Sequence, residues 1–168
     1  MGGEWKQNKS WSDKYLPEIK QILGLHFIGE APLEEDAQNN TDLIVLKLDP
    51  LRFACRVRKS DYLQRFGDEF TVRQKVPSGN KTELTKIIEG WGDYMFYGFA
   101  DETKLASWKI GSLNVFRLWF AKQLAKNCGR MPGKVLSNKD YSSDFVAFRW
   151  DELPKDFVIA EYDSLSFS

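Results

Sequence analysis

Three short runs of residues between positions 43 and 75 constrain the fold most. Residues 43–48 (LIVLKL) are nearly all apolar, which is typical of a strand that is covered on both faces. Residues 52–58 and 69–75 alternate apolar and polar side chains, as strands do when one face packs on a core. Runs so closely spaced predict strands at the centre of a β-sheet.

The alternation gathers positive charge on one side of the predicted sheet. In both alternating runs the polar positions are rich in arginine and lysine. If the two strands are neighbours, these cations share one face and repel one another unless an anionic group neutralises them. That group is either an internal carboxylate or the phosphate backbone of a nucleic acid. The candidate nucleic-acid-binding residues are therefore Arg52, Arg56, Arg58, Arg73 and Lys75.

Charge is unevenly distributed along a chain whose net charge is zero, with 24 Lys and Arg against 24 Asp and Glu. Cations outnumber carboxylates in residues 52–86, whereas carboxylates outnumber cations in residues 1–50 and 140–168. A basic patch on an otherwise acidic surface favours one local anionic partner over indiscriminate binding of polyanions. Ordinary solvated strand faces explain the same pattern without any partner.

Three segments have apolar residues at helical spacing and predict helices beside the sheet. Gly24 is a stop signal for the first of them. Asn80 and Glu83 form a capping-box arrangement at the start of the second. Ser112 is the N-cap of the third. The predicted helices cover residues 12–23, a segment from Asn80 to Gly90, and residues 113–127.

Further strand signals flank these helices. The last two strands are joined across Pro154 and predict a β-hairpin. Trp108 is expected to begin a turn, and residues 130–143 are expected to form a long polar connector. These additional strands are predicted at residues 25–32, 93–100, 145–150 and 157–162.

The whole chain is therefore predicted to be an α+β protein with a central mixed β-sheet flanked by helices. Its 168 residues and 42% hydrophobic content suit a single folded domain, residues 1–168. It contains no charged-then-apolar leader and no apolar run near ~18 residues, so we expect neither a signal peptide nor a membrane span. Two cysteines and one histidine exclude a disulfide framework and make a zinc site unfavourable. A reducing, cytoplasmic location is expected.

Several common catalytic motifs are missing. The sequence has no GxxxxGK[ST] loop, no GxGxxG after a strand, no GxSxG elbow and no HExxH. The chemistry that remains is metal chemistry with carboxylate oxygens as ligands, or binding without catalysis.

The order of elements over residues 12–100 resembles the core of the PD-(D/E)XK, or restriction-endonuclease-like, nuclease superfamily. In that family an Asp opens the second core strand, and an acid and a Lys two positions apart follow on the third. Here Asp42 opens the run 43–48, and Arg56-Val57-Arg58 follows in the next strand. The resemblance implies a restriction-endonuclease-like core, with residues 101–168 as a C-terminal extension that adds a helix and the β-hairpin.

The chain departs from that pattern at the second acid. Arg56 occupies the position of the acid and cannot ligate Mg²⁺, and Arg58 occupies the position of the lysine but cannot act as a base. A nuclease needs carboxylates to hold the metal that activates water. The missing acid must then come from Glu35, Asp36, Glu69 or Glu83, although Glu83 also has its predicted capping role. The resemblance implies Asp42, Glu83 and Lys86 as catalytic residues, with Asp42 and Asp36 as Mg²⁺ ligands.

Three functions follow from these observations. The first is a diverged Mg²⁺-dependent nuclease acting on DNA. The second is a protein without catalysis or cofactor that binds nucleic acid through its basic strands. The third is a small interaction protein, of the kind encoded by phages or mobile elements, that binds a host protein complex through its acidic ends and aromatic C-terminal strands.

Overall fold

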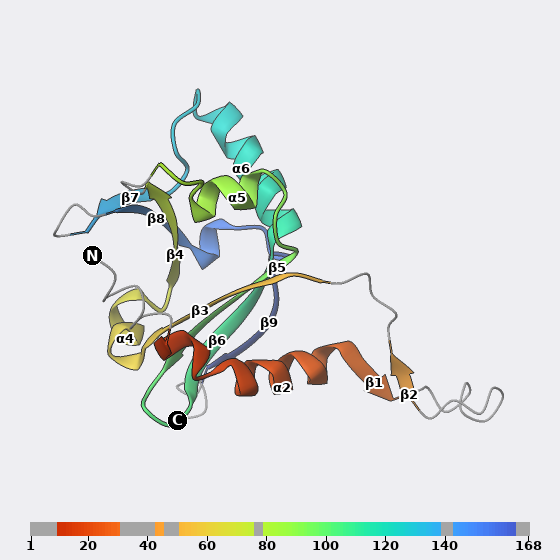
Figure 1. Cartoon of the computed structure of the whole chain (residues 1–168). Coiled ribbons are helices and arrows are strands. Elements are labelled where there is room, and N and C mark those ends of the chain that lie inside the picture. The colour runs from red at the N-terminus through yellow and green to blue at the C-terminus, as the bar shows by residue number, and fades with distance from the viewer. Residues whose placement is uncertain (1–9, 31–42, 46–50, 76–78, 139–142, 164–168) are drawn as a thin grey trace. The chain divides into compact units, whose positions relative to one another are not determined.

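The computed structural model describes residues 10–30, 43–45, 51–75, 79–138 and 143–163. The chain forms two compact units, Met1–Pro50 and Leu51–Ser168 (Figure 1). No helix in the described part of the chain is long and apolar enough to cross a membrane.

In its described residues the N-terminal unit has a short helical segment at residues 10–13, the helix α2 and a two-stranded sheet. Helix α2, Leu16–Phe27, buries Tyr15 just before its start and Ile19 in its first turns. The helix runs through Gly24, so the predicted stop is wrong, and His26 lies in the helix and not in a strand. An isolated glycine inside a helix costs only ~1 kcal/mol and does not by itself end it.

The strand predicted at residues 43–48 is not a central strand. Among the described residues, strand β2, Leu43–Val45, pairs with the three-residue strand β1, Ile28–Glu30, in a two-stranded antiparallel ladder. Strand β3 pairs instead with β5. The expected restriction-endonuclease-like pairing of these two runs is therefore not seen.

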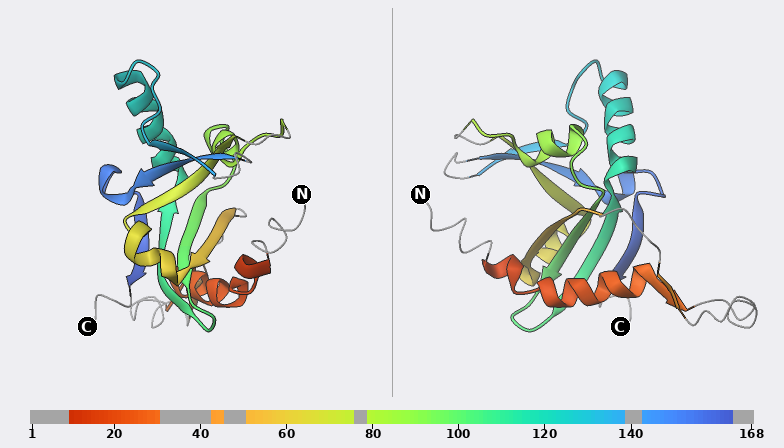
Figure 2. Two further views of the ribbon diagram at one scale, coloured as in Figure 1. Left: turned by 90° about the vertical axis from the view of Figure 1, so that its left-hand side faces the viewer. Right: turned by 45° about the vertical axis from the view of Figure 1, so that its right-hand side comes forward.

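The C-terminal unit is built on a mixed four-stranded sheet with the order β3-β5-β6-β9. The pair β3–β5 is parallel, and the other two pairs are antiparallel. Figure 2 shows β5 and β6 running side by side, with α6 continuing from the end of β6. A mixed sheet in an α+β fold is thus confirmed. Its strands are β3 Phe53–Lys59, β5 Tyr94–Ala100, β6 Leu105–Ser112 and β9 Val158–Asp163.

A second, three-stranded antiparallel sheet has the order β4-β8-β7. The two alternating runs, β3 and β4, lie in different sheets, so the condition under which their cations would share one sheet face is not met. The C-terminal hairpin is also wrong, because β8 pairs with β4 and β7, whereas β9 pairs with β6. The strands of this sheet are β4 Glu69–Lys75, β7 Lys134–Ser137 and β8 Asp144–Arg149.

Two strands were not predicted from the sequence. Trp108, expected to begin a turn, lies in the middle of β6. Strand β7 lies inside the segment expected to be a polar connector. Its only large apolar residues are Val135 and Leu136, so its hydrophobic signal is weak.

Short helices connect and cover the strands of the C-terminal unit. The turn η1, Ser60–Tyr62, leads into α4, Leu63–Phe66. Helix α5, Glu83–Ile88, has Thr82 as its N-cap, whose side chain accepts a hydrogen bond from Thr85 N, so the capping box at Asn80 is wrong. Helix α6, Leu113–Lys126, begins at its predicted cap, Ser112. A short turn, η2 Trp150–Glu152, follows β8.

One hydrophobic core joins both sheets and the two longer helices of this unit. Phe70 and Val72 of β4, Tyr97 of β5 and Phe116 of α6 all lie in it and are fully or almost fully buried. Residues 101–168 supply much of this core, including Phe148 and Phe157. The core covers one face of the β4-β8-β7 sheet, and the opposite face is available for other contacts.

Candidate anion-binding pocket

The face of the β4-β8-β7 sheet that turns away from the core carries polar and charged side chains. Directly paired residues of an antiparallel sheet lie on the same face. Phe70 pairs with Phe148 and Val72 with Val146, and all four are buried. The alternate positions form the other face: Glu69 opposite Arg149, Thr71 opposite Ala147, Arg73 opposite Phe145, and Ala147 opposite Lys134.

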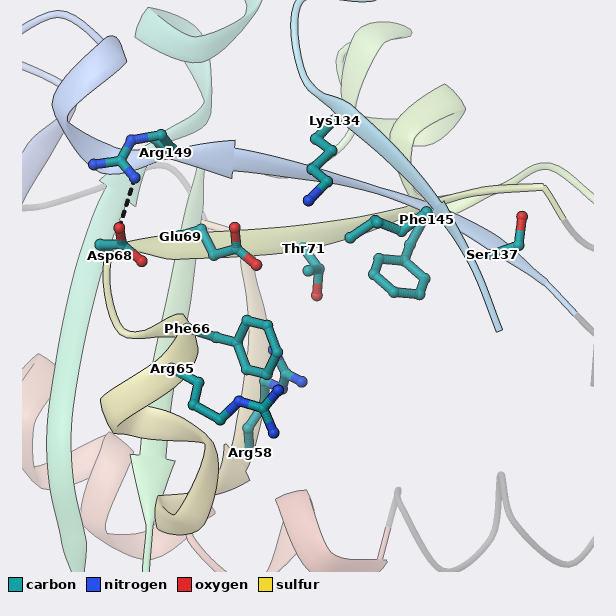
Figure 3. A pocket seen from close by; sticks show the side chains of 11 residues that line it. Arg58, Arg65, Phe66, Asp68, Glu69, Thr71, Lys134, Ser137, Phe145 and Arg149 are labelled. Atoms are coloured by element: carbon teal, nitrogen blue, oxygen red, sulfur yellow. Dashed lines mark hydrogen bonds and ion pairs between the residues drawn. The ribbon is translucent and has the colours of Figure 1, made fainter. Parts of the chain in front are cut away.

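A pocket of about 450 Å³ lies over this face. Figure 3 shows it between the three-stranded sheet and the segment that carries Arg58, Arg65 and Phe66. Its volume is within the ~300–1,000 Å³ that is usual for small-ligand sites. Cations outnumber carboxylates in its lining, which suits an anionic ligand. The lining residues are Arg58, Arg65, Phe66, Asp68, Glu69, Thr71, Lys134, Leu136, Ser137, Phe145 and Arg149.

Arg58 is held in place by aromatic side chains. Its guanidinium carbon lies 4.8 Å from the ring centroid of Tyr62 and 5.4 Å from that of Phe66. Its Nη1 lies 3.5 Å from the hydroxyl oxygen of Tyr97. Cation–π contacts hold the charge without neutralising it. Arg58 is therefore a pre-positioned cation in the pocket wall.

Arg56, by contrast, is neutralised inside the protein. Its Nη2 donates to Glu83 Oε2 at 2.8 Å, and its Nη1 donates to the carbonyl oxygen of Thr71 at 2.8 Å and to the Thr71 hydroxyl at 3.2 Å. Glu83 Oε2 also accepts from Arg73 N at 3.1 Å. The internal carboxylate that the sequence left open is thus Glu83.

These contacts form a continuous chain behind the pocket. The Thr71 hydroxyl, bonded to Arg56, lies 3.2 Å from the Tyr97 hydroxyl, which in turn contacts Arg58. A chain of satisfied polar groups stiffens the elements that it joins. The ion pair at Arg56 therefore supports the floor of the pocket and the position of Arg58.

Of the four cations in the pocket lining, only Arg149 forms ion pairs with carboxylates of the described residues. Arg149 binds Asp68 at 2.7 Å and Asp151 at 2.9 Å, and these partners raise its pKa. Within the described ranges, no carboxylate forms an ion pair with Arg58, Arg65 or Lys134. These three cations come from β3, α4 and β7, and they are here called the cation triplet. The triplet is the main electrostatic feature of the pocket.

Glu69 is the second carboxylate in the pocket lining, and unlike Asp68 it forms no ion pair with Arg149. Partial burial raises the pKa of Glu69, and the neighbouring Asp68 carboxylate raises it further. Lys134, Arg58 and Arg149 act in the opposite direction. Glu69 therefore takes up a proton at higher pH than an ordinary glutamate would.

Binding of an anion in this pocket should depend on the protonation of Glu69. The Glu69 carboxylate repels an anion, and protonation removes that repulsion. The affinity for sulfate, which does not titrate in this range, is expected to rise as the pH falls from about 7 towards about 4.5, near the ordinary glutamate pKa. Calorimetric titration of wild type and Glu69→Gln measures this effect. The variant should bind sulfate more tightly at pH 7 and lose the pH dependence, and a wild-type affinity that is flat with pH would contradict the role of Glu69.

The structure places the other predicted site residues differently. Asp42 and Asp36 lie outside the described residues. Glu83 begins α5 and is engaged by Arg56, and Lys86 is exposed in the last turn of the same helix. Among the described residues no group of three His, Cys, Asp or Glu side chains could hold a metal ion. The proposed Mg²⁺ site thus depends on carboxylates that the structure does not describe.

The remaining predicted cations are also separated from one another. Arg52 is exposed before β3, and its backbone N–H donates to Asp93 Oδ2 at 2.8 Å. Arg73 lies on the pocket face, but a register shift follows it, so that Lys75 is opposite Asp144. Since adjacent residues of β8 point to opposite faces, Lys75 leaves the face of Arg73. Of the five predicted nucleic-acid-binding residues, only Arg58 lines the pocket.

Several pocket residues have no clear signal in the sequence. Arg65 and Phe66 lie in a short helix, and Lys134 lies in the unpredicted strand β7. Only the pairing of distant strands brings Lys134 and Phe145 beside Thr71. The chain matches no protein-family model, no curated protein and no solved structure.

Proposed function

We propose that this protein binds nucleic acid without cleaving it, and that the pocket over the β4-β8-β7 sheet is the binding site. The observation that carries this proposal is the cation triplet, Arg58, Arg65 and Lys134, which faces one pocket from three different elements. Unengaged cations that converge on a pocket are an energetic cost unless an anion occupies it.

Two features favour a nucleic acid over a simple anion. The pocket contains the aromatic rings of Phe66 and Phe145 beside its cations, and proteins that bind single strands combine such rings with a positively charged groove. Arg73 lies on the same sheet face, two residues from Thr71 along β4. This spacing is about 7 Å along a strand and extends the positive face beyond the pocket.

The contrast between Arg56 and Arg58 supports binding without metal-dependent cleavage. In the described residues Glu83 neutralises Arg56 through an ion pair of 2.8 Å. The pocket carboxylates are Asp68, which is held by Arg149, and Glu69, and with no third carboxylate in the lining they do not form a metal-binding group. The chemistry of the pocket is therefore that of anion recognition.

Salt dependence tests the proposal. The affinity for a short single-stranded oligonucleotide, measured by fluorescence anisotropy, should fall with salt at a log–log slope of about −2, as three phosphate contacts imply. Lys134→Gln should weaken binding and make the slope shallower by about 0.7. Lys122→Gln, an equal charge change on the exposed side of α6, is the control and should alter neither value. A flat salt dependence, or equal effects of the two variants, would reject the proposal.

A further inference from the structure

We propose that the pocket accepts one unpaired guanine nucleotide, with its base on the aromatic walls, its Watson–Crick edge on Glu69 and its phosphate on Arg65 and Lys134. This inference rests on the proposed function and gives it a base preference. Three sets of contacts support it: the aromatic walls, the exposed cations and the unengaged carboxylate.

The aromatic walls come from opposite sides of the pocket. Phe66 is supplied by α4, and Phe145 is supplied by β8 (Figure 3). The guanidinium carbons of Arg58 and Arg65 lie 5.4 Å and 5.5 Å from the Phe66 ring centroid. Bases of single-stranded nucleic acids stack on aromatic rings and on guanidinium planes. The half-buried Phe145 ring and a guanidinium plane packed on Phe66 therefore provide the surfaces for a base, and a base inside a duplex is already stacked and cannot use them.

The phosphate would be bound by cations that reach solvent. Arg65 and Lys134 are both exposed, and neither forms an ion pair within the described part of the chain. Arg65 lines the pocket from α4 and Lys134 lines it from β7. In Figure 3 these two side chains lie on either side of Glu69 and Thr71. A phosphate between them would accept charge-assisted hydrogen bonds from both side chains while its nucleotide enters the pocket.

Glu69 supplies the preference for guanine. Of the two carboxylates in the lining, Asp68 is occupied by Arg149 at 2.7 Å, whereas no described residue donates a hydrogen bond to Glu69. A carboxylate has two acceptor oxygens side by side. Guanine presents two adjacent donors, N1–H and the N2 amine, on its Watson–Crick edge, and base pairing in a duplex makes this edge inaccessible. A carboxylate thus recognises the unpaired base and discriminates against bases with fewer donors.

A panel of pentanucleotides tests the inference. All members have thymine at the flanking positions and carry guanine, hypoxanthine or thymine at the centre, and the guanine oligomer is also tested as a duplex. Hypoxanthine differs from guanine only by the missing N2 amine. We expect the single strand with guanine to bind about 10-fold more tightly than the one with hypoxanthine, as the loss of a charged hydrogen bond implies, and more tightly than the duplex.

Two variants separate the base contact from folding effects. Glu69→Gln should reduce the preference for guanine over hypoxanthine to less than about twofold. Phe145→Leu should weaken all single strands while it retains the preference for guanine. Circular dichroism shows whether both variants are folded. Equal affinities for guanine and hypoxanthine, or a duplex bound as tightly as the single strand, would overturn the guanine site while salt-dependent binding remains. Failure of every oligonucleotide to bind would overturn the proposed function as well.

Discussion

Replacement of Phe70 by alanine is expected to lower the free energy of unfolding by about 3–5 kcal/mol. Phe70 has no solvent exposure. Its ring centroid lies 4.6 Å from that of Trp150, 5.5 Å from Phe148, 5.7 Å from Phe157 and 6.0 Å from Phe116. These neighbours belong to β8, η2, α6 and the segment before β9, so the ring joins the second sheet to the rest of the core.

The size of this effect follows from the rigidity of the surroundings. Removal of a phenyl group leaves a cavity that the surrounding aromatic rings fill poorly, and the loss of transfer free energy adds to the cost of the cavity. Urea denaturation measures the change. Leu118→Ala is the control, because Leu118 of α6 is 76% exposed and its loss should change stability by less than about 0.5 kcal/mol. A loss below about 1 kcal/mol for Phe70→Ala would show that this core is not packed as described.

The double substitution Arg65→Glu and Lys134→Glu is expected to weaken oligonucleotide binding by about 100-fold or more. Each cation donates a charge-assisted contact of about 1.5 kcal/mol, and the loss of two corresponds to about 3 kcal/mol, or about two powers of ten. The new carboxylates add repulsion. Both residues are exposed and lack ion pairs within the described residues, so the fold should tolerate the change.

A matched control separates the pocket from the overall charge of the protein. Lys122→Glu and Lys126→Glu, both exposed on α6, produce the same net charge at another place. Anisotropy titrations at one salt concentration compare the two double variants. The α6 variant should lose only a few-fold in affinity, through weaker long-range attraction. Equal losses in both variants would mean that net charge, and not the pocket, governs binding.

The local patterns of the sequence predicted elements better than they predicted pairings. Alternation identified β3 and β4, and the Ser112 cap located the start of α6. Alternation shows which side chains share a face of one strand, but it does not show which strand lies beside another. For this reason the sequence does not reveal that β3 and β4 lie in different sheets, and the hairpin predicted for β8 and β9 is wrong.

The candidate site was only partly predictable for the same reason. The sequence predicts Arg58 as an anion-binding residue, and Arg58 does line the pocket. The sequence also predicts Arg56 as an anion-binding residue, but Glu83, 27 residues later in the chain, neutralises it. Lys134 and Phe145 reach the pocket through pairing of β8 with both β4 and β7. Local periodicity in the sequence cannot reveal contacts between residues so distant in the chain.

The most direct measurement maps the bound nucleic acid on the protein itself. Backbone amide shifts from nuclear magnetic resonance can be followed while a short single strand with a central guanine is titrated into the protein. The largest changes are expected at Arg58, at Arg65–Thr71, and along β7 and the start of β8, which together surround the pocket. Changes centred instead on the exposed Trp91 and Leu118, with the pocket amides unmoved, would contradict the account.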